Sequence, residues 1–240
     1  MFRFKRFSIL ITVFVFAVSV ITAQSNSGGM TVEESYLKDT MEIMIIRETA
    51  RANSREQKFV ALEFINEAIN RGNKSEEIRQ TLDFLSKEGR RSVAMENGRV
   101  VNNFPDVRRL SAMYLGQIGS EEARKSLLDM CQFENEPMVL QEAIKALGDI
   151  GVNENNDTVI IIAWVFSRFN NLNPDNLMAL ATIDAFENIA RQNNGINHPE
   201  AVRVLTQIAE GKYIAPVKER AWQLLSDMRS YGGTGNTMGR

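Results

Sequence analysis

The chain has 240 residues, of which 44% are hydrophobic and 24% are charged, and its formal net charge is −2. This is ordinary globular composition, and it argues against disordered and collagen-like chains. Without a strong basic field we expect no nucleic-acid partner. A single cysteine and a single histidine exclude disulfide scaffolds, zinc fingers and His-based catalytic triads. We therefore predict no metal site, no small-molecule cofactor and no catalytic residue.

The first 23 residues have the order of a secretory signal peptide. Three bases precede the uncharged stretch Ser8–Ile21, and Ala23 is a small residue suited to the cleavage site. The alternative is an uncleaved membrane anchor, because the apolar run from residue 7 to 23 approaches the roughly 20 residues that a spanning helix needs. Both interpretations place residues 24–240 outside the cytoplasm, which in a bacterium means the periplasm or cell envelope.

Most of the remaining chain has the amphipathic period of helices, separated by short breaks. Prolines lie at predicted helix starts and glycines at predicted ends, where a left-handed residue closes a helix. The glycines are Gly72, Gly119, Gly151, Gly195 and Gly211. The predicted helices span residues 31–52, 54–71, 75–88, 105–118, 120–132, 137–150, 154–169, 174–193, 198–210 and 214–229. Residues 24–35 and 230–240 lack a core pattern and are predicted to be a flexible linker and tail.

Internal repeats connect several of these helices. Val107–Gly119 matches Val139–Gly151 at an offset of 32, and offsets of 39 and 39 reach two later copies. The shared positions fall on one helix face, and a column of small residues among them predicts close approach of a neighbouring helix. The columns are Val107, Val139, Met178 and Val217; Ser111, Ala143, Thr182 and Ala221; Leu115, Leu147, Phe186 and Leu225; and Ile118, Ile150, Ile189 and Met228.

The intervening helices repeat as well. Ser75–Leu82 matches Ser120–Leu127, and Pro199–Arg203 is a looser copy. Both serines are predicted to cap their helices, with the following glutamates at the positive helix end. The unit is therefore a helix–turn–helix that occurs about five times and must stack on its neighbours to bury its apolar face.

These residues resemble a known family. Val107-Arg108, then Leu115-Gly116 and Ile118-Gly119, is similar to the HEAT-like repeat family, especially its short variants. The resemblance extends over about residues 54–229 and implies an all-α solenoid with a role in protein binding or scaffolding. We predict a repeat domain over residues 36–229, and we expect no catalysis because no catalytic motif is present. The positions equivalent to Arg108 hold Leu140, Ala179 and Lys218, so we expect no regular row of positive charges along the repeats. The unequal offsets predict an irregular curve.

Residues 89–104 interrupt the repeats. Asn97-Gly98 is a strong two-residue turn signal and predicts a short β-hairpin at residues 93–101. A basic run surrounds this insertion, and one interpretation is a site for an acidic partner. The alternative is a solvated, locally balanced surface. The predicted binding residues are Arg90, Arg91, Arg99, Arg108 and Arg109.

Three further residues have structural interpretations. Cys131 follows apolar residues and is predicted to be buried, His198 lies at a helix start, and Trp164 belongs to the apolar run Val159–Phe166 that predicts a core helix. The leading functional hypothesis is an exported, non-enzymatic interaction or scaffold module. The alternatives are an accessory or regulatory subunit of an enzyme complex, and a membrane-anchored adaptor that keeps residues 1–23.

Overall fold

The computed structural model describes residues 31–170 and 174–233, and the predicted signal segment lies outside them. Contacts divide the chain into two units, residues 1–42 and residues 43–240, and the repeats lie in the second. The elements are α2 (Val32–Arg51), α3 (Arg55–Asn70), α4 (Glu76–Ser86), β1 (Met95–Glu96), β2 (Arg99–Val100), α5 (Pro105–Ile118), α6 (Glu121–Phe133), α7 (Pro137–Ile150), α8 (Asp157–Asn170), α9 (Asn176–Gln192), α10 (Pro199–Glu210) and α11 (Ala215–Gly233).

Each predicted helix is present, with shifts at some ends. A 3-10 turn at Glu154–Asn156 precedes α8, and α9 starts after Asp175, whose carboxylate accepts hydrogen bonds from two backbone N–H groups of the first turn. Helix α2 begins inside the segment predicted as a linker, and α11 continues to Gly233 inside the predicted tail. Gly211 does not have the predicted left-handed conformation, since its φ is −77°. A Cβ at Gly211 would lie 2.5 Å from a backbone oxygen, so close packing explains this glycine.

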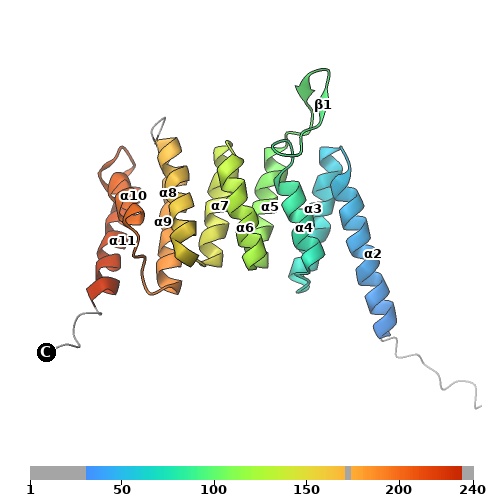
Figure 1. The fold of residues 1–240 in the computed structure, drawn as a ribbon, viewed down its shortest axis with the longest axis horizontal. Coiled ribbons are helices and arrows are strands. Elements are labelled where there is room, and N and C mark those ends of the chain that lie inside the picture. The colour runs from blue at the N-terminus through green and yellow to red at the C-terminus, as the bar shows by residue number, and fades with distance from the viewer. Residues whose placement is uncertain (1–30, 171–173, 234–240) are drawn as a thin grey trace, which may run out of the picture. The chain divides into compact units, whose positions relative to one another are not determined.

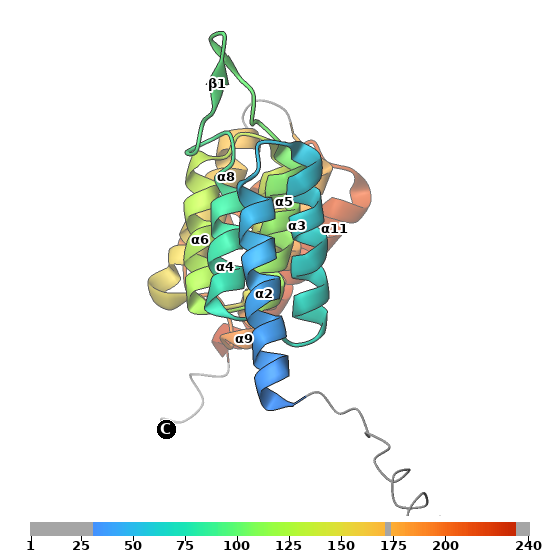
Figure 2. The same ribbon diagram turned by 90° about the vertical axis from the view of Figure 1, so that its right-hand side faces the viewer.

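Within the second unit the helices alternate between two layers (Figures 1 and 2). Helices α3, α5, α7, α9 and α11 contact one another in sequence, and α4, α6, α8 and α10 form the other layer. Successive helices pair across the layers, for example α4 with α5 and α10 with α11. This is the all-α solenoid that the repeats predict.

The predicted repeat columns form the core between the layers. Ser111, Ala143 and Thr182 are 0% exposed, as are Leu115 and Leu147. The small residues of the second column are buried, as the prediction of a close neighbouring helix requires. Close approach also occurs at two glycines outside the columns, Gly116 and Gly148, where an added Cβ would lie 2.7 Å from Ala146 Cβ and 2.5 Å from Ala185 Cα.

The repeated helix starts in the second layer also carry contacts between repeats. Ser120 caps α6 by accepting the Ala123 N–H at 3.1 Å, as predicted, but the Ser75 side chain makes no such bond. Arg124 Nε pairs with Glu121 at 2.7 Å, and its Nη1 reaches Asp157 of α8 at 2.8 Å. Arg124, which belongs to the repeated helix start, thus forms one ion pair within α6 and another with the next helix of the layer.

Three single-residue predictions have different outcomes. Cys131 is buried, and burial raises the pKa of its thiol to about 12. His198 is the N-cap of α10, where its ring nitrogen Nδ1 accepts the Glu200 N–H at 3.4 Å. The helix that contains Trp164 packs into the core as predicted, since Val165 and Phe166 are buried, but Trp164 itself is 44% exposed. Across the described ranges, no helix is both long and apolar enough to cross a membrane.

Candidate interaction surface at the insertion

The insertion forms the predicted β-hairpin, which projects from the layer ends (Figure 1). Met95 pairs with Val100 in antiparallel register. Asn97 and Gly98 both have positive φ, 49° and 75°, as a type I′ turn requires. The apolar side chains of this hairpin are open to solvent: Val93 is 48% exposed, Met95 62%, Val100 45% and Val101 40%.

A buried amide fixes the two ends of the hairpin to each other. The Asn102 Nδ2 group donates to Glu88 Oε1 at 2.8 Å and to the Ser92 carbonyl at 2.6 Å, while its Oδ1 accepts the Ala94 N–H at 2.8 Å. Gly89 lies against the same segment with φ of 67°, and a Cβ there would approach the Asn102 carbonyl oxygen to 2.5 Å. The base of the hairpin is therefore closely packed and hydrogen bonded.

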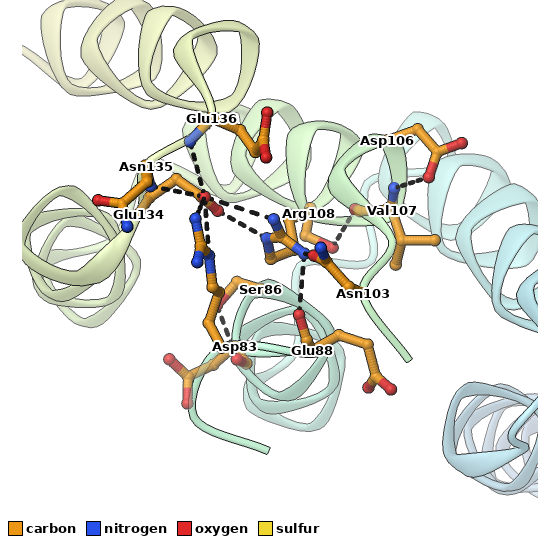
Figure 3. A network of polar contacts seen from close by, with 12 residues as sticks. Asp83, Ser86, Glu88, Asn103, Asp106, Val107, Arg108, Glu134, Asn135 and Glu136 are labelled. Atoms are coloured by element: carbon orange, nitrogen blue, oxygen red, sulfur yellow. Dashed lines mark hydrogen bonds and ion pairs between the residues drawn. The ribbon is translucent and has the colours of Figure 1, made fainter. Parts of the chain in front are cut away.

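Below this base lies a buried ion pair between α5 and the end of α6 (Figure 3). Arg108 is 0% exposed, and its Nε donates to Glu134 Oε2 at 2.6 Å. Its Nη1 donates to the Glu88 carbonyl at 3.0 Å and to Asn103 Oδ1 at 2.9 Å. One guanidinium thus connects the start of the insertion, its end and the next repeat.

Glu134 accepts more hydrogen bonds than Arg108 alone supplies. Arg90 Nη2 reaches Glu134 Oε1 at 3.0 Å, and the backbone N–H groups of Asn135 and Glu136 donate to the same oxygen at 2.8 and 3.0 Å. Burial by itself would raise the pKa of the Glu134 carboxyl, but the hydrogen bonds from Arg108 and from the backbone outweigh it and hold the pKa below its usual range.

A second buried charge pair lies on the other side of the base. Lys58 of α3 is 2% exposed, and its Nζ lies 3.1 Å from Glu88 Oε2. The same Nζ donates to the Ala50 carbonyl at 3.0 Å. Unpaired charges are costly in a protein interior, and both ions here have partners.

The structure brings most of the predicted binding arginines to this base, but in different states. Arg108 is interior, so an external partner has no access to it. Arg91 pairs with Asp129 at 2.9 Å and its guanidinium lies 4.0 Å above the Phe133 ring. Arg109 points to Glu142 of α7 at 3.4 Å. Arg99, at the exposed hairpin, has no ion-pair partner among the described residues.

The sequence did not identify the residues that pair with these arginines or that hold the base of the hairpin. Glu134, Glu88 and Asn102 follow no recognisable spacing, and Glu134 lies 26 residues from Arg108 and 44 from Arg90. Only the fold brings them together. No group of three or more potential metal ligands occurs among residues 31–170 and 174–233.

Comparison with known proteins finds a similarity over part of the repeats. Residues 99–162, from the second strand of the hairpin into α8, match the model of HEAT repeats. No curated protein matches the chain. This central segment is therefore similar to HEAT repeats, and it lies within an all-α solenoid.

Proposed function

We propose that this protein is an exported, non-enzymatic interaction module that contacts a partner protein through the hairpin at residues 93–101. The observation that carries the proposal is the exposure of four apolar side chains on a projecting hairpin. Exposed apolar surface of this kind is typical of interaction sites. HEAT repeats are generally protein-interaction or scaffold modules and are typically non-enzymatic, which supports the same class.

The attachment of the hairpin supports a binding role. Helix–helix connections usually need roughly 2–8 residues, whereas this one holds a hairpin on a buried polar base. An ordered base reduces the entropy that binding would otherwise cost, so the apolar tip is presented in one conformation. Within this proposal the surface consists of the unpaired Arg99 and the four apolar side chains of the hairpin, rather than the predicted arginine cluster as a whole. The apolar residues are Val93, Met95, Val100 and Val101.

The proposal is tested by replacing the apolar tip with polar residues of similar size. The double variant Met95→Gln, Val100→Thr should fold normally, because both side chains are exposed. The matched control is Met44→Gln, Val202→Thr, since Met44 is 62% exposed like Met95, and Val202 is 46% exposed against 45% for Val100. The measurement is affinity capture from the native envelope fraction, with quantitative mass spectrometry and circular dichroism of each variant.

We expect the wild type and the control to recover the same partner and the hairpin variant to lose most of it. Equal recovery by all three proteins would remove the hairpin from the binding surface.

Export is a separate part of the proposal and rests on the order of residues 1–23. Intact-mass analysis of protein from its native host should show the loss of about 23 residues. A full-length mass in the membrane fraction would instead support the anchored adaptor.

A further inference from the structure

The positive charges near Glu134 outnumber its single carboxylate. Arg90 and Arg108 both donate to this carboxylate, and Arg168 of α8 donates through Nη2 to the Glu134 backbone carbonyl at 2.6 Å. Two guanidinium groups therefore contact the carboxylate of Glu134, and a third contacts the backbone carbonyl of the same residue. The adjoining Lys87 and Arg91 do not change this surplus, because they are matched by Asp83 and Asp129.

Arg168 is the member of this group that lacks a carboxylate. Its Nε is buried and has no hydrogen-bond acceptor within the described residues. Its guanidinium carbon lies 4.6 Å from the Trp164 ring centre and 4.9 Å from that of Phe169. Burial lowers the pKa of Arg168, and the positive charge of Arg90 adds to this effect, while the negative charge of Glu134 opposes it. The guanidinium is thus partly desolvated, and it forms no direct ion pair with a carboxylate among the described residues.

The exposed Trp164 stacks on this guanidinium, and two further exposed apolar side chains lie on the same helix or on the neighbouring helix α6. Trp164 is 44% exposed, Ile160 on the same helix is 41% exposed, and Phe133 at the end of α6 is 46% exposed. Tryptophan and arginine are the residues most enriched among those that dominate binding energy at protein interfaces. We call the partly exposed Arg168, which has no carboxylate partner, together with Trp164, Ile160 and Phe133 the Arg168 surface.

We propose that the Arg168 surface binds an acidic segment of the partner protein, with a carboxylate on the Arg168 guanidinium and an apolar side chain on Trp164. Planar guanidinium and carboxylate groups form paired, charge-assisted hydrogen bonds, which are among the stronger polar contacts. The ion pair from Arg90 to Glu134 makes this surface continuous with the hairpin base, so one partner can contact both. This inference rests on the proposed function, because it assigns chemistry to the same partner.

A second basic surface provides the competing assignment. A cavity of about 200 Å³ between α2 and α4 is lined by Arg47, Arg51, Gln80 and Phe84, among others. Arg51 has a partner in Glu48 at 3.6 Å, but Arg47 has none among the described residues. Any anion-binding assay must therefore distinguish this cavity from the Arg168 surface.

The test uses the full chain with Trp222→Phe, which leaves Trp164 as the sole tryptophan. The probe is the peptide acetyl-Glu-Glu-Phe-Glu-Glu-amide, with the all-lysine analogue of the same length as the matched control. We expect saturable change in Trp164 emission with the acidic peptide and none with the lysine peptide. Binding should weaken as salt rises, because screening reduces the attraction.

Variants of single arginines then locate the site. Arg168→Gln should weaken peptide binding by about tenfold or more, which is the range expected for a lost charge-assisted hydrogen bond. Arg191→Gln removes an exposed arginine that pairs with Glu187 on α9, and Arg47→Gln removes the unpaired arginine of the cavity. Both controls should bind as the parent does. Arg168→Lys keeps the charge and should show an intermediate affinity, which separates loss of binding from loss of folding.

Three results would overturn the inference: equal binding by Arg168→Gln, loss of binding only in Arg47→Gln, or an emission change with phosphatidylglycerol vesicles but not with the peptide. The hairpin variant Met95→Gln, Val100→Thr should keep its peptide affinity. If the hairpin variant loses partner capture as expected but the parent does not bind the peptide, this inference alone is refuted. If the hairpin variant keeps partner capture and the parent binds the peptide, the proposed function is refuted and the Arg168 surface stays in place.

Discussion

The sharpest test of the repeat packing is the substitution Gly116→Ala in α5. A Cβ at this position would lie 2.7 Å from Ala146 Cβ and 3.1 Å from Ala146 Cα of α7, whereas ordinary contacts begin at 3.4 Å. In an isolated helix the change would stabilise by about 1 kcal/mol, because glycine is a poor helix former. Overpacking of a filled interface costs roughly 1–3 kcal/mol and opposes that gain. We therefore expect a net loss of about 1 kcal/mol in the free energy of unfolding.

The second variant makes this test specific. Ala146→Gly removes the atom that the new Cβ meets first and leaves a contact of 3.1 Å, so the double variant should be more stable than the sum of the single effects. At Gly148 the nearest atom is Ala185 Cα at 2.5 Å, and a glycine at position 185 cannot remove it. Rescue should therefore occur at the first pair and be weaker at the second.

Urea unfolding followed by circular dichroism measures these differences, with each single and double variant compared at one protein concentration. Stabilisation by Gly116→Ala close to its full helix-propensity gain would show that α5 and α7 do not approach closely there. Additive effects in the first pair would lead to the same conclusion.

Three further outcomes follow from the core and the charge network. Leu147→Ala should cost about 2–5 kcal/mol in urea unfolding, because Leu147 is 0% exposed in the repeat core; a change below 1 kcal/mol would contradict its placement. Arg108→Met should cost about 3 kcal/mol, because it leaves Glu134 buried with fewer donors, whereas Arg109→Met should cost less than about 1 kcal/mol because its pair is partly exposed. Since the folded-state pKa of Glu134 is lowered, its stabilisation is present above the unfolded pKa of about 4.3 and is lost as pH falls through the folded value. The melting temperature of Glu134→Gln should therefore fall less steeply with decreasing pH than that of the wild type in that acid range. Equal slopes for the two proteins would contradict this account.

The helices and the repeat register were predictable because both follow from local patterns. Apolar residues at helical spacing identify the buried face, and prolines and glycines mark most of the ends. The close contacts at Gly116 and Gly148 were not predicted, because these glycines lie outside the columns. Ser111 and Ala143 are small and buried, and the missing side chains at 116 and 148 let the neighbouring helix approach there as well.

The sequence pattern also could not predict which single residues of a correctly predicted helix are exposed. The run Val159–Phe166 contains so many apolar residues that its period does not show which face is outside. The structure buries Val159, Ile162 and Phe166 and leaves Ile160 and Trp164, one turn apart, in contact with solvent. Which face is covered depends on the direction of α6 and α10, and no local pattern records that direction.

The roles of the arginines in the basic run were not predictable either, because both interpretations treated these arginines as one group. Arg108 is an interior group, Arg90 and Arg91 have acidic partners from the next repeat, and Arg99 alone is unpaired at the exposed hairpin. A charge that already has a buried or stacked partner contributes to the position of the insertion rather than to capture of a ligand. The two surfaces that we propose for a partner are therefore the apolar hairpin tip and the guanidinium of Arg168, which the sequence did not single out. Glu134 connects the base of the hairpin to Arg168, because it contacts Arg90 through its carboxylate and Arg168 through its backbone carbonyl.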